Sequence, residues 1–322
     1  MDGCGLRRLS ERRSAQYGGA TVSMHIIVGY DPKTCDLAPV DFGVAAARFT
    51  GAPLMIASVH GVGDDRLAER QLSEDLLADA AETLEELKGE LHAQGIAAEY
   101  RDLASTSAPR ALHELADSEN AGLLVIGSTR QGTVGRLLPG STAQRLMHGA
   151  PCPIAVVPHG WRAGEGLKTI GVAYVDTEEG REALRGAHAL ARQAGATLRV
   201  LTVAGVRLSA YSETEARTAS RPGKDFDEVE GEHRVLAETA ARNAVAELEG
   251  DVAVQVDAFA EDPAQTLIAV SDNLDLLVCG SRGYGPVRAV LLGGVSRRVA
   301  AEAHCPLIVL PRGVPASLQA LA

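Results

Sequence analysis

The chain contains an internal repeat, and this feature limits its possible folds more than any other. Residues 127–160 and 280–313 align without a gap at a constant offset of 153 residues. The identities include Gly127/Gly280, Ser128/Ser281, Gly132/Gly285, Gly140/Gly293, Arg145/Arg298, Cys152/Cys305, Pro153/Pro306, Pro158/Pro311 and Gly160/Gly313. Self-similarity at a fixed period indicates that one structural unit has been duplicated. We therefore expect two copies of one domain.

Each copy alternates strand-like and helix-like segments in the same order. The first strand (25–31 and 169–176) is followed by a helix with a glycine in its C-cap region, Gly51 or Gly195, and then by a second strand. A long amphipathic helix (about 66–94 and about 228–249), a third strand and a helix with proline in its first turn follow; these prolines are Pro109 and Pro263. A fourth apolar strand, a glycine-rich segment, a helix and a final strand close each copy.

Alternating elements with apolar strands predict parallel sheets covered by helices on both faces. The predicted organisation is an N-terminal tail (1–23), a first domain (24–160), a linker (161–167), a second domain (168–313) and a C-terminal tail (314–322). The copies differ mainly by a longer polar segment, 205–232, in the second one.

Composition excludes several classes of function. Of the 322 residues, 46% are apolar and 23% charged, as in ordinary globular proteins. The net charge of −11 argues against nucleic-acid binding, which needs clustered Lys and Arg. No apolar run is long enough to span a membrane, and the N-terminal segment has no apolar stretch typical of a secretory signal. Five scattered cysteines suit packed free thiols and a cytoplasmic protein.

The glycine-rich segments are the candidate binding sites. In doubly wound sheets, ligands bind at the carboxyl ends of the strands where the strand order reverses. Glycines after the fourth strand let backbone N–H groups approach a phosphate, and the helix that follows favours an anion. The first copy has Gly127 to Gly140 followed by Ser141 and Thr142, whereas the second has Gly280, Gly283, Gly285, Gly293 and Gly294.

These motifs resemble the universal stress protein family. The resemblance rests on G-x2-G-x9-G-[S/T] after the fourth strand, an Asp after the first strand and a Pro-flanked apolar final strand, and it covers about residues 24–313. It implies two tandem Rossmann-like domains of the adenine nucleotide alpha hydrolase-like type, each a five-stranded parallel sheet of order 3-2-1-4-5. It further implies a regulator of stress response or dormancy that binds ATP, with or without Mg²⁺, and has no defined reaction.

The resemblance assigns roles to residues of the first copy. Asp31 and the backbone of Val59 would approach the adenosine, and Gly127, Gly140, Ser141 and Thr142 would hold the phosphates. Arg130 stands where the motif has its second glycine. Two readings of Arg130 remain open: it blocks a close backbone approach, or its guanidinium binds phosphate.

The second copy departs from the pattern differently. Gly280, Gly283 and Gly293 are all present, but Gly294 replaces the hydroxyl residue, with Ser296 nearby. Val175 occupies the position of the Asp, and Asp176 comes one residue later. Because side chains alternate along a strand, we expect Asp176 to point away from the site.

Structural roles compete with these assignments. Asp31 could be only a turn residue, and the glycines could serve only strand–helix packing. No motif of a hydrolase, P-loop or zinc protease is present, so a binding module is the leading hypothesis. The alternative is a nucleotide-independent scaffold acting through protein–protein contacts. An ATP-pyrophosphatase is disfavoured because YDPKTC follows the first strand in place of the Ser-Gly-Gly-x-Asp-Ser loop.

The final strands of the two copies predict how the copies associate. Both are short, apolar and flanked by prolines, as expected at a sheet edge, where free backbone hydrogen-bonding groups need to be controlled. The family resemblance implies that this last strand pairs two domains, so we expect residues 153–157 to pair antiparallel with residues 306–310 and form an intramolecular pseudo-dimer. The alternative is an unpaired edge that loops bury. A homodimer of the whole chain is a further arrangement that the sequence leaves open.

Overall fold

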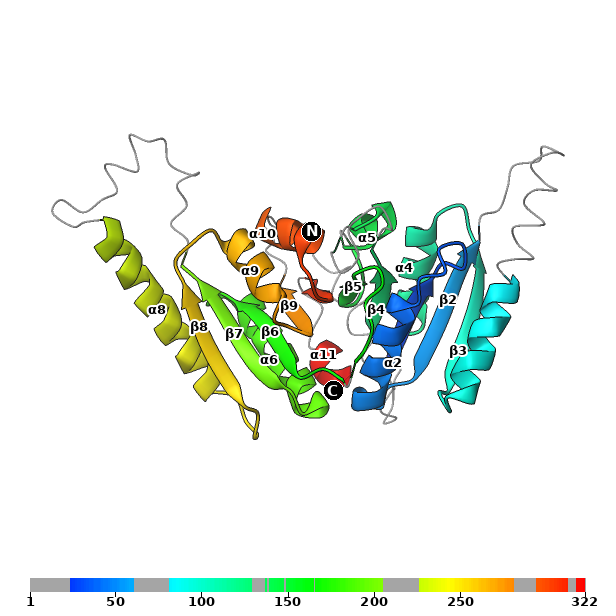
Figure 1. Cartoon of the computed structure of the whole chain (residues 1–322), viewed down its shortest axis with the longest axis horizontal. Coiled ribbons are helices and arrows are strands. Elements are labelled where there is room, and N and C mark those ends of the chain that lie inside the picture. The colour runs from blue at the N-terminus through cyan, green and yellow to red at the C-terminus, as the bar shows by residue number, and fades with distance from the viewer. Residues whose placement is uncertain are drawn as a thin grey trace, which may run out of the picture.

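The computed structural model describes residues 24–60, 81–128, 137, 139–147, 149–164, 166–204, 226–280, 294–311 and 317–321. The described strands form one ten-stranded sheet in the order β3-β2-β1-β4-β5-β10-β9-β6-β7-β8. In Figure 1 the first copy, blue to green, and the second, green to red, spread to opposite sides of the centre of the molecule. The predicted N-terminal tail lies outside the described residues, as does most of the longer polar segment of the second copy.

Each half of the sheet has the predicted order. The strands of the first half are β1 (His25–Tyr30), β2 (Leu54–His60), β3 (Ala98–Ala104), β4 (Ala121–Gly127) and β5 (Ile154–Val157). Those of the second half are β6 (Thr169–Tyr174), β7 (Thr197–Val203), β8 (Val254–Phe259), β9 (Leu276–Gly280) and β10 (Leu307–Leu310). All pairs within a half are parallel. The 3-2-1-4-5 order and the α/β class are thus confirmed.

Helices cover both faces of this sheet. The helices are α2 (Ala38–Thr50), α4 (Ala108–Ser118), α5 (Ser141–Met147), α6 (Glu178–Ala194), α8 (Phe226–Ala246), α9 (Pro263–Ser271), α10 (Gly294–Glu302) and α11 (Ser317–Leu321), and residues 81–93 are also helical. One apolar cluster includes side chains of α2, α6, α8 and α11, and a second includes those of α4, α5, α9 and α10. Along β1, Ile26 and Val28 join the first cluster and Ile27 the second, as alternation along a strand requires.

Local sequence signals account for the helix ends. Gly51 and Gly195 end α2 and α6 in the left-handed conformation, with φ of 72° and 64°, which glycine adopts without steric cost. Pro109 and Pro263 lie in the first turns of α4 and α9. At the start of α9 the carboxylate of Asp262 also accepts a hydrogen bond from the backbone N–H of Gln265 at 2.8 Å.

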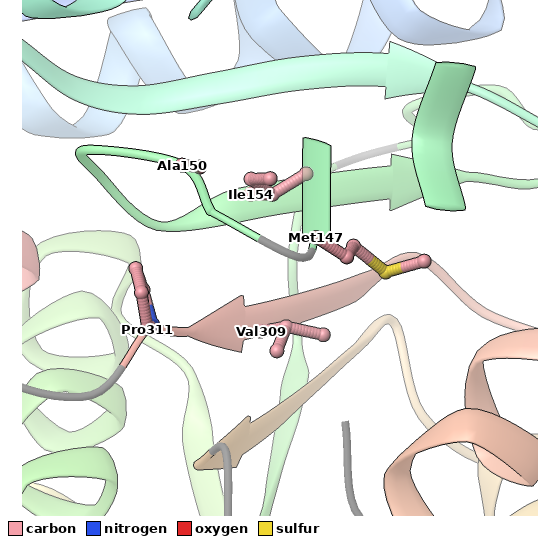
Figure 2. Close-up of a pocket in the computed structure, with 5 residues that line it drawn as sticks. All are labelled: Met147, Ala150, Ile154, Val309 and Pro311. Carbon is pink, nitrogen blue, oxygen red and sulfur yellow. The ribbon is translucent and has the colours of Figure 1, made fainter. Parts of the chain in front are cut away.

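The two halves meet at β5 and β10. These strands are antiparallel, with Leu307 opposite Val156 and Val309 opposite Ile154. Figure 2 shows Ile154 and Val309 beside a small apolar pocket of about 150 Å³, which Met147, Ala150 and Pro311 also line. We call this β5–β10 contact the seam. It joins two parallel sheets into one, which is why the core clusters run across both repeats.

Two segments outside the repeated pattern pack against it, the linker on the first half and the C-terminal segment on both halves. In the linker, the ring of Trp161 packs edge-on against Phe42 of α2 at 5.5 Å between centroids, and Arg162 pairs with Asp41 at 2.8 Å. The predicted C-terminal tail contains α11, whose Leu318 and Leu321 are buried. This helix packs against α6 of the second half and β4 of the first. Sequence reasoning did not anticipate it.

Candidate functional site: the carboxyl ends of the central strands

The strand order reverses between β1 and β4 in the first half and between β6 and β9 in the second. β1 has β2 on one side and β4 on the other, so successive crossovers leave in opposite directions. The carboxyl ends of these strands are Tyr30 and Gly127 in the first half, and Tyr174 and Gly280 in the second. These are the positions at which doubly wound sheets bind ligands.

Asp31 follows β1 immediately and is exposed. Its carboxylate accepts a hydrogen bond from the backbone N–H of Lys33 at 3.1 Å. Its carbonyl oxygen accepts hydrogen bonds from both the backbone N–H and the hydroxyl of Thr34. The residue therefore organises a turn at the end of β1, and its carboxylate remains accessible from the strand ends.

Gly127 ends β4 beside the loop that follows β1. A Cβ added at Gly127 would lie 3.6 Å from Pro39 and 3.8 Å from a carboxylate oxygen of Asp36, which is ordinary contact distance. A methyl group would therefore fit at this strand end without a clash.

Asp36 is a functional candidate that sequence reasoning missed. Its side chain is 8% exposed, and one oxygen accepts hydrogen bonds from the backbone N–H groups of Ala38 and Gly160. The other oxygen lies 2.9 Å from Nδ1 of His159, at ion-pair distance but without hydrogen-bond geometry. The acidic residue just before α2 is a sequence signal for helix capping, but nothing in the sequence indicated its contact with His159.

Ser128 adds to this group of residues. Its hydroxyl accepts a hydrogen bond from the backbone N–H of His159 at 2.9 Å, and its own N–H donates to the carbonyl of Val157. Together with Asp36, it fixes the chain after β5 against the ends of β1 and β4. These contacts lie beside Gly127 at the carboxyl end of β4.

Val59 lies near the end of β2, beyond the last residue pair with β1, which is Tyr30 with Ser58. It is still paired with Leu103 of β3. Beyond it, Nδ1 of His60 lies 2.9 Å from the Asp102 carboxylate. The structure therefore places Val59 at the carboxyl end of β2, next to the end of β1.

Gly140, Ser141 and Thr142 form the start of α5. The carbonyl of Gly140 accepts a hydrogen bond from the N–H of Gln144, as expected of a residue that opens a helix. Ser141 is exposed and Thr142 is partly buried. Arg130 lies outside the described residues.

The second half differs at the same place. Its strand–helix loop, 175–177, is shorter than the corresponding loop 31–37, so α6 begins closer to the strand end. A Cβ at Gly280 would lie only 3.0 Å from the carbonyl oxygen of Glu179, in the first turn of α6. The first turn of α6 therefore covers the end of β9.

The carboxylate of Asp176 is hydrogen-bonded to two neighbouring side chains. Its carboxylate accepts hydrogen bonds from Nε of Arg181 at 2.9 Å and from the Tyr174 hydroxyl at 3.1 Å. Both interactions favour the ionised carboxyl and lower its pKa. Ser296, on α10, is buried. Gly283 and Gly293 lie outside the described residues.

Other kinds of site were sought in the part of the chain that the structure describes. No group of three or more His, Cys, Asp or Glu there could hold a metal ion. None of the described helices is both long and apolar enough to cross a bilayer. The pocket at the seam is too tight to hold even a water molecule, whereas small-molecule sites have volumes of roughly 300–1,000 Å³. The strand ends are therefore the principal candidate site.

Comparisons with known proteins agree with this architecture. The chain is 29% identical over 297 residues to a universal stress protein of Mycobacterium tuberculosis, covering 89% of this chain and 100% of the relative. A universal stress protein of Mycolicibacterium smegmatis is 30% identical over 137 residues, covering 42% of this chain and 99% of that relative.

Among solved structures, a universal stress protein from Archaeoglobus fulgidus superposes with a TM-score of 0.61 at 20% identity, covering 89% of this chain and 98% of that one. This similarity supports the fold. The sequence model of the universal stress protein family matches residues 23–158 and again residues 166–311. The chain therefore belongs to the universal stress protein family and carries two copies of its domain.

Proposed function

We propose that the chain is an adenine-nucleotide-binding regulator of stress response or dormancy, and that its first repeat carries the stronger ATP site. The observation that carries this proposal is the difference between the two strand ends. Gly127 has neighbours at ordinary contact distance, whereas Gly280 is crowded by the carbonyl of Glu179. A phosphate can reach the backbone N–H groups only at a strand end that neighbouring atoms do not crowd.

Both repeats carry carboxylates beside these strand ends, namely Asp36 beside Gly127 and Glu178 and Glu179 in the first turn of α6. A carboxylate repels a phosphate, so a cation such as Mg²⁺ bound with the nucleotide would favour binding in either repeat. The choice of the first repeat therefore rests on the space at the strand ends.

Different residues of the first repeat would contact different parts of the nucleotide. Asp31 and the backbone of Val59 would contact the ribose and the base, since Asp31 follows β1 and Val59 lies next to its end. Gly127 and Gly140 would present backbone N–H groups to the phosphates, with Ser141 and Thr142 donating from the start of α5. The proposal assigns no catalysed reaction.

Calorimetric titration of the full chain with ATP and Mg²⁺ tests the proposal. We expect one binding event per chain. Asp31→Ala should weaken it about ten- to hundredfold, the effect of losing a hydrogen bond to a charged group. Gly140→Ala should also weaken it, because the added methyl group hinders the approach of a phosphate to the backbone N–H. Asp176→Ala, the matched change in the second repeat, should leave the affinity unchanged. Absence of heat with the wild-type chain at millimolar ATP would overturn the proposal.

One observation favours the alternative of a nucleotide-independent scaffold. Val235 and Leu236 are adjacent on α8 and are 55% and 66% exposed. Such residues become part of a protein-binding surface where they belong to a larger contiguous apolar patch. The same titration separates the two functions, because a scaffold requires no nucleotide.

A further inference from the structure

The carboxyl end of β2 carries a histidine–aspartate pair to which the proposed function gives no role. Nδ1 of His60, the last residue of β2, lies 2.9 Å from the carboxylate of Asp102 on β3. These two strands are neighbours in the sheet (Figure 1). Asp102 is opposite Ser58, and residues two apart on a strand share a face, so His60 and Asp102 are diagonal neighbours on one face. The imidazole is therefore held from β3.

The second repeat has alanine at both equivalent positions. Its strand register identifies them, because Thr202 pairs with the last residue of β6 just as Ser58 pairs with the last residue of β1. Two residues beyond Thr202 is Ala204, and opposite Thr202 is Ala258. The pair thus belongs to the repeat to which the proposed function gives the stronger nucleotide site.

A purely structural role does not account for the pair. The side chains of His60 and Asp102 are 29% and 63% exposed, and exposed ion pairs contribute little to stability. The register between β7 and β8 forms with alanine at these positions, so the fold does not require the pair. The same exposure leaves part of the imidazole accessible to a ligand.

The imidazole belongs to the residue next to the proposed base contact. The carbonyl of His60 accepts a hydrogen bond from the N–H of Ser105, on the β3 side. Successive residues of a strand in a parallel sheet direct their backbone groups to opposite neighbours, so those of Val59 face β1. Pairing between β1 and β2 ends at Tyr30 and Ser58. A base bound to the backbone of Val59 therefore lies past the end of β1, beside His60.

The pair determines which hydrogen bond the imidazole can offer. A carboxylate only accepts hydrogen bonds, so Nδ1 carries the proton when the ring of His60 is neutral. Nε2 is then an acceptor. The 6-amino group of adenine donates a hydrogen bond, whereas the 6-oxo group of guanine accepts one. An acceptor beside the base therefore distinguishes these two purine classes.

We propose that His60 selects 6-amino purine nucleotides over 6-oxo purine nucleotides at the first repeat, by accepting a hydrogen bond from the base. Asp102 is a positioning residue, which acts by fixing the tautomer of the imidazole. This inference rests on the proposed function, since that function places the base at Val59.

The test is calorimetric titration of the full chain with ATP and with inosine triphosphate, which has the 6-oxo group but lacks the 2-amino group of guanine. Mildly alkaline pH keeps a histidine neutral. The wild type should bind ATP more tightly. His60→Ala should weaken ATP binding about three- to tenfold, the effect of losing one hydrogen bond, and leave inosine triphosphate unaffected. Asp102→Ala should reduce the same preference, because Nδ1 no longer has a fixed acceptor.

Asp257→Ala is the matched control in the second repeat. Asp257 of β8 accepts a hydrogen bond from Nε of Arg199 on β7 at 2.9 Å, so its loss also breaks a cross-strand pair. This variant should keep both affinities. An unchanged preference in His60→Ala, or the same change in Asp257→Ala, would overturn the selection. An unchanged preference in Asp102→Ala would overturn the positioning role.

Nitrogen-15 NMR of the ligand-free chain tests the tautomer directly. The neutral ring of His60 should carry its proton on Nδ1 in the wild type and lose this preference in Asp102→Ala. A proton on Nε2 in the wild type would overturn the inference while leaving the proposed function intact, as would equal affinity for the two nucleotides. If the wild type binds neither nucleotide, the proposed function fails and the selection fails with it.

Discussion

Nδ1 of His159 lies 2.9 Å from the buried carboxylate of Asp36, so the segment that follows β5 contacts the loop after β1. The other Asp36 oxygen accepts from the N–H groups of Ala38 and Gly160. One side chain thus connects the start of α2, the chain that leaves the seam, and the strand end at Gly127.

We predict that Asp36→Ala destabilises the chain by about 1–3 kcal/mol, because it leaves buried N–H groups without an acceptor. Asp36→Asn should cost less, since its amide oxygen can still accept both hydrogen bonds. Urea denaturation gives the free energies of unfolding. Asp31→Ala is the matched control, because the Asp31 side chain is exposed and its carboxylate accepts from the backbone N–H of Lys33. Similar stability of Asp36→Ala and Asp31→Ala would contradict the role given to Asp36.

Gly122→Ala should destabilise the chain by about 1–3 kcal/mol through overpacking. A Cβ at Gly122 would lie 2.7 Å from Leu321 of α11 and 2.9 Å from the Cβ of Met24, and the Met24 atom cannot move without its backbone. The control is Gly89→Ala, where no atom lies within 4 Å. Because Gly89 is helical, alanine there should stabilise by roughly 0.5–1 kcal/mol. Thermal unfolding of both variants measures the difference, and a neutral Gly122→Ala would show that α11 does not pack on β4.

The buried thiols should be unreactive in the native protein. Burial raises the pKa of Cys152 and of Cys279 to about 12, and it also raises the pKa of Cys305. Cys35 is exposed. In a Cys4→Ser background at mildly alkaline pH, we expect a disulfide reagent to modify Cys35 alone, as peptide mass spectrometry would show. Rapid modification of Cys152 without unfolding would contradict this burial.

The same thiols make the free energy of unfolding decrease at alkaline pH. Their folded pKa lies above the ordinary value of 9.0, so above that value the folded state binds more protons than the unfolded state. The contribution of the protonated thiols to the free energy of unfolding is complete below pH 9, and it is lost as the pH rises through their folded pKa of about 12. A Cys152→Ala, Cys279→Ala variant should therefore show a flatter decline of unfolding free energy at alkaline pH. An unchanged slope would rule out this contribution.

The fold was predictable because its determinants are local and occur twice. Structure within a few residues is specified by the apolar strands, by Gly51 and Gly195 at helix ends, and by Pro109 and Pro263 at helix starts. Because the domain is repeated, each of these signals occurs twice in the sequence. The parallel order within each half followed from the family resemblance. Asp31, Val59 and Gly127 were likewise located at the strand ends, although their roles as ligand contacts stay predictions.

The contacts that sequence reasoning missed are formed between distant segments. Asp36 meets His159 only after β1 and β5 are placed in the sheet, and neither residue is identical in the other copy of the repeat. The crowding at Gly280 arises from the short loop 175–177, whose length is visible in the sequence but whose effect depends on where α6 begins. Helix α11 has only five residues and is stable because Leu318 and Leu321 are buried by other elements.

The position of α11 also affects the order in which the protein can fold during synthesis. Leu321 packs beside Gly122 and Met24, which belong to the first repeat, while Leu318 packs beside Gly186 of α6. Domains ordinarily fold from the N-terminus as the ribosome releases them. Here the apolar face of the first repeat stays incomplete until residues 317–321 have been made. During synthesis, the first domain therefore lacks the packing of α11 until the second domain has been made. The two domains then reach their final packing together.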